Sequence, residues 1–114
     1  MATIAKHIFS ASTNGRGIKV AATATPGTLI HTADTTALDE ITAYVTNTDV
    51  ADRSVTFEMG GTTSPNDHLT LIVPAGETSL VIPALILTGG VALRAYASTA
   101  NVLVVFGYVN RITA

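Results

Sequence analysis

The alternation of apolar and polar residues along the chain predicts short β-strands. It is clearest over 40–48, where apolar residues recur at every second position and mostly polar residues lie between them. Because successive side chains of a strand point to opposite faces, this segment has one face suited to a core. The same pattern resumes over 53–60, after the turn at 47–52. We therefore expect these two segments to form a β-hairpin.

Turn residues divide most of the remaining chain into further short strands. Glycine, proline and asparagine recur roughly every 8 to 12 residues, which is typical of all-β folds. No segment keeps the period of about 3.6 residues of an amphipathic helix, so the helices of a βαβ fold are not expected. We predict an all-β fold, a single antiparallel β-sandwich of about eight strands with jelly-roll or immunoglobulin-like topology. The further strands are expected at 3–9, 28–32, 69–73, 78–82, 85–87, 91–97 and 101–112, with Pro83 ending the strand 78–82.

The stretch 101–112 is apolar on both of its faces. Alternation predicts one face made of Val102, Val104, Phe106 and Tyr108 and another made of Leu103, Val105 and Val109. A strand with one face open to water would carry polar residues on that face. We therefore expect a central strand that is covered by a second sheet on one side and by another segment or another subunit on the other.

A second apolar segment, 80–87, also carries apolar side chains that have to be shielded from water. One small sandwich core cannot easily absorb both faces of both segments, so part of this surface is expected to lie between subunits. The alternative is that the N-terminal segment folds over the outer face within one chain. The candidate subunit-interface residues are Leu85, Ile86, Leu87, Leu103, Val105 and Val109.

The N-terminal part of the chain lacks large side chains over 20–27, where small residues lead into a Pro26-Gly27 turn. We assign 1–27 to an N-terminal strand with an extended arm and 28–114 to the β-sandwich. An arm of this kind can add a strand to the sheet of a neighbour. Deletion of 2–17 is then expected to weaken attachment and to leave the sandwich folded.

The low content of charged residues favours a protein with contact surfaces. Charged residues make up 12% of the chain, about half of the roughly 25% that is usual for soluble domains. The net charge is −2, and the six Lys and Arg residues are too dispersed to form a stripe for phosphates. Nucleic-acid binding is therefore not expected.

Membrane and secretion signals are not expected either. The apolar runs fall well short of the roughly 20 residues that cross a bilayer, so no membrane partner is predicted. Lys6 and His7 occupy the place where a secretion signal needs its apolar centre. The absence of cysteine excludes disulfides and thiol nucleophiles.

The residues that could carry chemistry do not form a recognisable pattern. His7, His31 and His68 lie on three separate segments without the paired spacing of a zinc site. Ser64, Asp67 and His68 are close in sequence, but no Gly-x-Ser-x-Gly elbow accompanies them. We therefore predict no catalytic residues and no enzymatic activity.

Metal and phosphate sites are also not predicted. No alternating Asp-x-Asp loop for calcium is present, so we expect solvated turns at the carboxylates Asp34, Asp39, Glu40, Asp49, Asp52 and Asp67. The glycine-containing segments 14–17 and 60–61 match no Walker or dinucleotide spacing and open no helix. No cofactor or metal is expected.

Several segments carry a resemblance to a known class of proteins. The strand and turn patterns of 30–33, 38–48, 57–67, 73–76 and 100–112 resemble short structural proteins of tailed bacteriophages. The resemblance implies a virion component without catalytic residues, and within that class a capsid decoration or cement subunit. It would form closed homo-oligomers, with trimers favoured, and would bind the major capsid protein or another virion protein. The rival interpretation is a fibre, spike or tail-tip module that binds a host-surface glycan, although the long loops lack aromatic residues.

Overall fold

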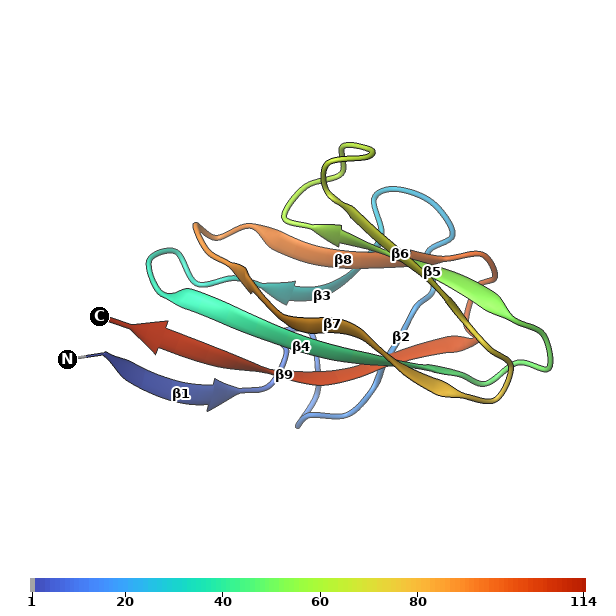
Figure 1. Ribbon diagram of the computed structural model, residues 1–114, viewed down its shortest axis with the longest axis horizontal. Coiled ribbons are helices and arrows are strands. Elements are labelled where there is room, and N and C mark those ends of the chain that lie inside the picture. Colours follow the sequence, from blue (N-terminus) through green and yellow to red (C-terminus); the bar gives the residue numbers. More distant parts are fainter. Residues whose placement is uncertain (1) are drawn as a thin grey trace.

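The computed structural model describes residues 2–114, which form nine β-strands in two antiparallel sheets (Figure 1). No helix occurs over this range, so none of sufficient length and apolarity to cross a membrane is found there. The all-β, sandwich-like fold is confirmed. The strands are β1 (Thr3–His7), β2 (Ile18–Lys19), β3 (Thr28–Thr32), β4 (Leu38–Asn47), β5 (Arg53–Met59), β6 (His68–Val73), β7 (Thr78–Leu87), β8 (Ala92–Ala97) and β9 (Leu103–Thr113).

The two sheets are layered on each other (Figure 1). The first, which we call sheet A, has the order β1-β9-β4-β7, and β2 pairs with β9 beyond the end of β1. The second, sheet B, has the order β3-β8-β5-β6. Because β1 runs antiparallel to the end of β9, Thr3 lies beside Thr113. The segment 101–112 accordingly supplies a central strand, as its pattern predicts.

The core lies between the inner faces of the two sheets. On β9 the odd-numbered residues point inward and the even-numbered ones outward, as alternation predicts. The predicted inward residues of β4 and β5 are buried as well, except Met59, which is partly buried against the core. The largest apolar side chains that are almost fully buried are Phe9, Ile30, Ile41, Phe57, Ile82, Leu93 and Leu103.

The predicted hairpin between 40–48 and 53–60 is wrong. β4 lies in sheet A and β5 in sheet B, so the connection between them crosses from one sheet to the other. The Asn47 side chain holds this corner, since its Nδ2 donates to the carbonyl oxygens of Ala51 and Val73, each at 2.9 Å. Alternation states which face of a strand is buried but not which strand lies beside it, and the pairing here is non-local.

Pro83 does not end a strand. A single strand, β7, runs through it, and the pairing with β4 shifts register twice near this point. Ala84 there has a φ of 62°, which is unusual for a residue with a side chain. Proline is tolerated because β7 is an edge strand, where one side of the backbone has no ladder partner to lose.

The N-terminal segment is part of the sandwich and not an arm. β1 pairs with β9 from Thr3 opposite Thr113 to His7 opposite Val109. Phe9 and Val20 are both buried core members. The boundary that we expected between 1–27 and 28–114 therefore does not separate an arm from a core, although Met1 lies outside the described residues.

Phe9 fills a space that a glycine on β9 leaves open. A Cβ on Gly107 would lie 2.1 Å from the carbonyl oxygen of Thr42 and 2.9 Å from the Phe9 ring. Gly107 thus lets both the β4 backbone and the Phe9 ring approach β9 closely. Deletion of 2–17 would remove this ring from the core, so the expectation that the sandwich stays intact after that deletion does not hold.

Candidate functional site

The outer face of sheet A is rich in exposed apolar side chains. On β9, Phe106 and Tyr108 remain 43% and 42% exposed, and on β4 Tyr44 remains 39% exposed. Leu80 and Ile86 of β7 are 48% and 50% exposed. We call this surface the A face; it comprises the outward residues of β1, β2, β4, β7 and β9. An exposed apolar surface of this kind commonly marks a contact site.

The register of the strands arranges these side chains in rows across the sheet. Tyr44 lies opposite Phe106 on one side and Leu80 on the other, which makes one apolar row. Leu38 lies opposite Ile112, which in turn lies opposite Ile4, giving a second such row. These cross-strand neighbours have Cβ atoms about 5 Å apart, so each row is a continuous apolar strip.

A polar row separates the two apolar rows. It runs from Lys6 through Asn110 to Glu40 and reaches Ile86 at the far edge. The Asn110 amide donates to the Glu40 carboxylate at 3.1 Å. The A face therefore offers apolar contact area together with charged groups at fixed positions, which suits specific recognition of a partner.

The outer face of sheet B is different in character. Its outward positions on β5, β6 and β8 are mostly polar, with Ile72 as an exposed apolar exception; the polar ones are Ser54, Thr56, Glu58, His68, Thr70, Arg94 and Tyr96. The chain also covers part of it, because Gly27 donates its N–H to the Glu58 carboxylate at 2.6 Å and the Thr25 hydroxyl bonds to the same group. Glu58 is almost fully buried as a result. Of the two outer sheet faces formed by residues 2–114, the A face is the one that combines a broad apolar surface with exposure.

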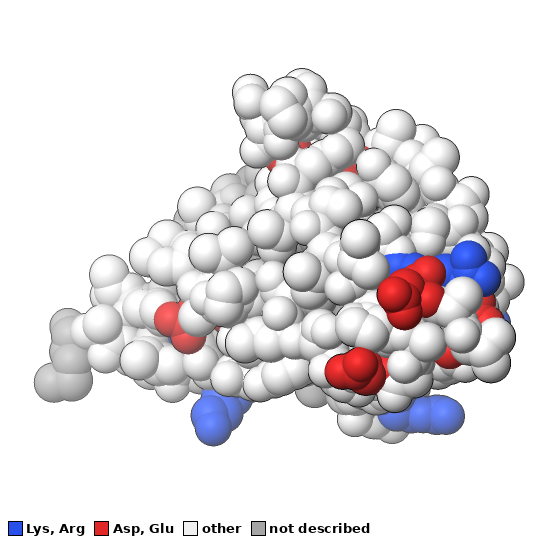
Figure 2. Space-filling model, turned by 45° about the vertical axis from the view of Figure 1, so that its right-hand side comes forward, with Lys and Arg blue, Asp and Glu red and all other residues white. Residues whose placement is uncertain are grey.

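Charged atoms are sparse over the side of the molecule that Figure 2 shows. Most of them lie toward one end, with a few isolated ones elsewhere, and a broad uncharged area lies beside the main group. This agrees with the low share of charged residues in the sequence. Large uncharged areas are unusual for a protein that stays free in solution.

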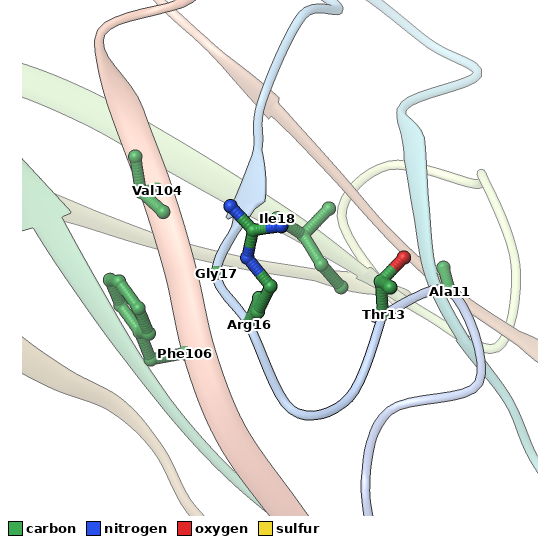
Figure 3. A pocket seen from close by; sticks show the side chains of 7 residues that line it. All are labelled: Ala11, Thr13, Arg16, Gly17, Ile18, Val104 and Phe106. Atoms are coloured by element: carbon green, nitrogen blue, oxygen red, sulfur yellow. The ribbon is translucent and has the colours of Figure 1, made fainter.

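A hollow of about 350 Å³ lies at one end of the A face (Figure 3). Val104 and Phe106 of β9 form one wall, and the loop that carries Thr13 and Arg16 forms the other. Gly17 sits so close to β9 that a Cβ there would lie 2.5 Å from Val104. An aromatic ring, a hydroxyl and a guanidinium are therefore grouped around a small open space.

A buried network of charged groups ties the N-terminal segment to both sheets. Arg111 donates to both carboxylate oxygens of Asp39, at 2.8 and 3.1 Å. His31 lies 2.7 Å from Asp39 through its Nε2 and accepts the Ser10 backbone N–H at its Nδ1. Since Nδ1 accepts, we assign the His31 proton to Nε2, which donates to Asp39.

This network stabilises the fold and is not arranged for catalysis. Burial would raise the pKa of Asp39, but the hydrogen bonds from Arg111 and His31 outweigh it and lower the pKa to about 2. The Ser10 hydroxyl accepts the Thr32 N–H, and His31 Nδ1 is already occupied. His31 therefore has no free nitrogen with which to take a proton from that hydroxyl.

The structure corrects three of the candidate interface residues. Leu103, Val105 and Val109 are fully buried in the intramolecular core, because their side of β9 faces sheet B. The open side of the same strand carries Val104, Phe106 and Tyr108, which the candidate set omitted. The omission follows from choosing the wrong face of a strand that is apolar on both.

The other three candidates lie on the edge strand β7. Leu85 and Ile86 are exposed, at 41% and 50%, and remain available to a partner. Leu87 is partly buried against the core. Exposed apolar side chains therefore occur at two of the three predicted positions on β7, and on β9 they lie one residue away from the predicted positions.

The residues considered for other chemistry stay apart or serve turns. The three histidines lie on β1, β3 and β6, and no group of three or more metal-ligating side chains that could hold a metal ion is found within 2–114. Asp67 accepts the Thr63 N–H at 3.0 Å and so closes its own loop. His68 Nε2 is 3.9 Å from the Glu58 carboxylate, too far for a hydrogen bond.

Comparisons of the chain with protein-family models, with curated proteins and with solved structures find no match. The function must therefore be argued from the chain itself.

Proposed function

We propose that the protein is a non-enzymatic structural subunit of a bacteriophage particle, with capsid decoration or cementing as its role. The observation that carries this proposal is the A face, a broad and mostly apolar surface that a single chain leaves open to water. A surface like this is stabilised when another protein covers it. The resemblance of the strand and turn patterns to tailed-phage structural proteins supplies the setting.

Closed homo-oligomers, with trimers favoured, fit the size of the A face. Four strand positions spaced about 4.8 Å apart make a face about 19 Å wide. If three such faces form the sides of a triangle around a three-fold axis, each face lies about 5.5 Å from the axis. This distance is close to half of the roughly 10 Å that separates two packed sheets, so the side chains of the three faces would fill the space around the axis. Such an assembly would seat on the major capsid protein or another virion protein and bridge its neighbours, adding contacts that resist internal pressure.

The experiment that tests this proposal localises the protein. Antibodies raised against the purified chain should label the shell of the particles in electron micrographs. Particles assembled without the protein should release their DNA at a lower temperature, and added protein should restore the release temperature. Particles that carry no label and release DNA at an unchanged temperature would refute the proposal.

A second candidate function, glycan binding by a fibre, spike or tail-tip module, is favoured by the hollow at Phe106. Carbohydrate sites use an exposed aromatic ring for stacking and polar groups for orientation, and here Thr13 and Arg16 stand beside the ring. A glycan array should then give a selective signal that Phe106→Ala abolishes. If the array gives a selective signal and the protein is absent from the particle shell, glycan binding would be preferred over capsid decoration.

A further inference from the structure

We infer that a second copy of this chain covers the A face, with the strands of the two copies aligned. The β1/β2 edge of one copy then lies against the β4/β7 side of the next. The inference rests on the proposed function in that it names the partner of the same surface, but it can be tested without a particle. It holds for any closed assembly that forms by rotation about an axis parallel to the strands.

The area of the A face is of the size that a stable interface needs. It is about 19 Å wide, and β9 contributes nine residues from Val104 to Ile112, or about 30 Å of length. The projected area is roughly 570 Å² before the relief of the side chains is counted. Two such faces together bury roughly 1,100 Å², which exceeds the roughly 1,000 Å² of total area that a specific interface needs.

The charges on this face are complementary to themselves. Within the described chain, the outward charged residues of the sheet A strands are Lys6, Lys19 and Glu40. Both lysines lie on the β1/β2 edge, whereas Glu40 lies on β4. The β1/β2 edge is therefore positive, and the negative group lies on the other side of β9.

The heights of Lys6 and Glu40 along the strands also match. Lys6 lies in the row of Glu40, through Asn110. Rotation about an axis parallel to the strands keeps every row at its height, so Lys6 of one copy meets the level of Glu40 of the next. Opposite charges brought together this way fix register and exclude other arrangements.

Association through the faces is favoured over association through the sheet edges. Pro83 and the register shifts interrupt the β7 edge, and Lys6 lies on the β1 edge. Prolines, bulges and lysines at these places are the devices by which proteins block strand addition. A second copy therefore gains contact through the A face and not by extending sheet A.

The test measures the dissociation constant of the wild-type protein and of variants by sedimentation equilibrium. Tyr108→Glu places a charge in the centre of the A face and should raise the dissociation constant at least tenfold. The matched control is Ile72→Glu, which introduces the same charge at an exposed apolar position on the outer side of sheet B and should leave it unchanged. Thermal melting of each variant verifies that the fold is retained.

The register is tested by exchanging charges. Lys6→Glu and Glu40→Lys should each raise the dissociation constant severalfold, and the double variant should restore it, because the two charges are then complementary again. A wild-type mass of one chain at every concentration, or a double variant no tighter than the single ones, would overturn the inference.

These outcomes are separable from those of the proposed function. If the purified protein is a monomer but antibodies detect it on the particle shell, the self-association is refuted and the virion role is supported. If the protein self-associates but is absent from particles, the virion role is refuted and the self-association is supported.

Discussion

Truncation of Phe9 should destabilise the whole sandwich, although Phe9 lies outside every strand and close to the N-terminus. The Phe9 ring is 2% exposed and packs where Gly107 has no side chain. Phe9→Ala leaves a cavity beside Gly107, which has no side chain of its own to fill it.

The size of the effect follows from the area that the ring buries. A phenylalanine buries about 150 to 250 Å², which at about 25 cal/mol per Å² corresponds to about 4 to 6 kcal/mol. Measured truncations of buried aromatic residues cost about 3 to 5 kcal/mol. A domain of this size loses about 4 °C of melting temperature per kcal/mol, so we expect a drop of about 12 to 20 °C.

Urea unfolding followed by circular dichroism measures this loss. Wild type and variants are compared at one low protein concentration, because self-association would add to the apparent stability. The matched control is Ile8→Ala, which truncates the adjacent residue, whose side chain is 48% exposed, and should cost about 1 kcal/mol or less. A loss below about 1 kcal/mol for Phe9→Ala would refute the placement of the N-terminal segment in the core.

Three further predictions concern Asp39, Gly107 and Glu58. Because the pKa of Asp39 is lowered to about 2, its ionised form stabilises the fold above about pH 4, and this contribution is lost as the pH falls towards 2. Asp39→Asn should therefore lower the melting temperature at neutral pH and flatten its decline in that acidic range, as calorimetry would detect; an unchanged profile would contradict the assignment. Gly107→Ala should cost about 1 to 3 kcal/mol in urea unfolding, since the added Cβ meets the Thr42 oxygen, and a neutral result would contradict that close approach. Glu58→Gln should speed hydrogen exchange over 21–27, because the two hydrogen bonds that hold this loop go to different carboxylate oxygens and Gln has one acceptor oxygen in place of two; unchanged exchange would contradict the role of Glu58 in holding the loop.

The sequence predicts the faces of the strands better than their partners. The bounds of β3 match the prediction, and the inward and outward positions of β4 and β9 follow from alternation. The neighbours of β4 could not be found in this way, because β7 and β9 pair with it across long separations in the chain. Local pattern contains no information on such pairing unless a short turn enforces it.

Two features of the core left a signal that sequence reasoning missed. Gly107 is the sole glycine within the apolar run 102–109, and a glycine inside a strand often marks a close approach of another segment. Asp39 and Arg111 have opposite charges and sit at inward positions of their strands by parity. In the structure they lie directly opposite each other, which explains how both are tolerated in the interior.

The candidate interface shows the limit of reasoning from one strand. The two faces of β9 are equally apolar in sequence, so the choice of the outer face depends on where sheet B packs. Leu103, Val105 and Val109 turned out to face sheet B, whereas Phe106 and Tyr108 face outward. The sequence of β9 predicts that both of its faces need to be buried, but it does not predict which face the rest of the chain leaves exposed.

The most direct test of the account asks whether the A face is covered when the protein is concentrated. The chain has no cysteine, so Leu80→Cys on the A face and Ile72→Cys on the outer side of sheet B each provide a single reactive thiol. We predict that thiol labelling of Leu80→Cys slows as the protein concentration rises, while that of Ile72→Cys stays constant. Equal and concentration-independent labelling of both variants would contradict the central claim that another copy covers this face.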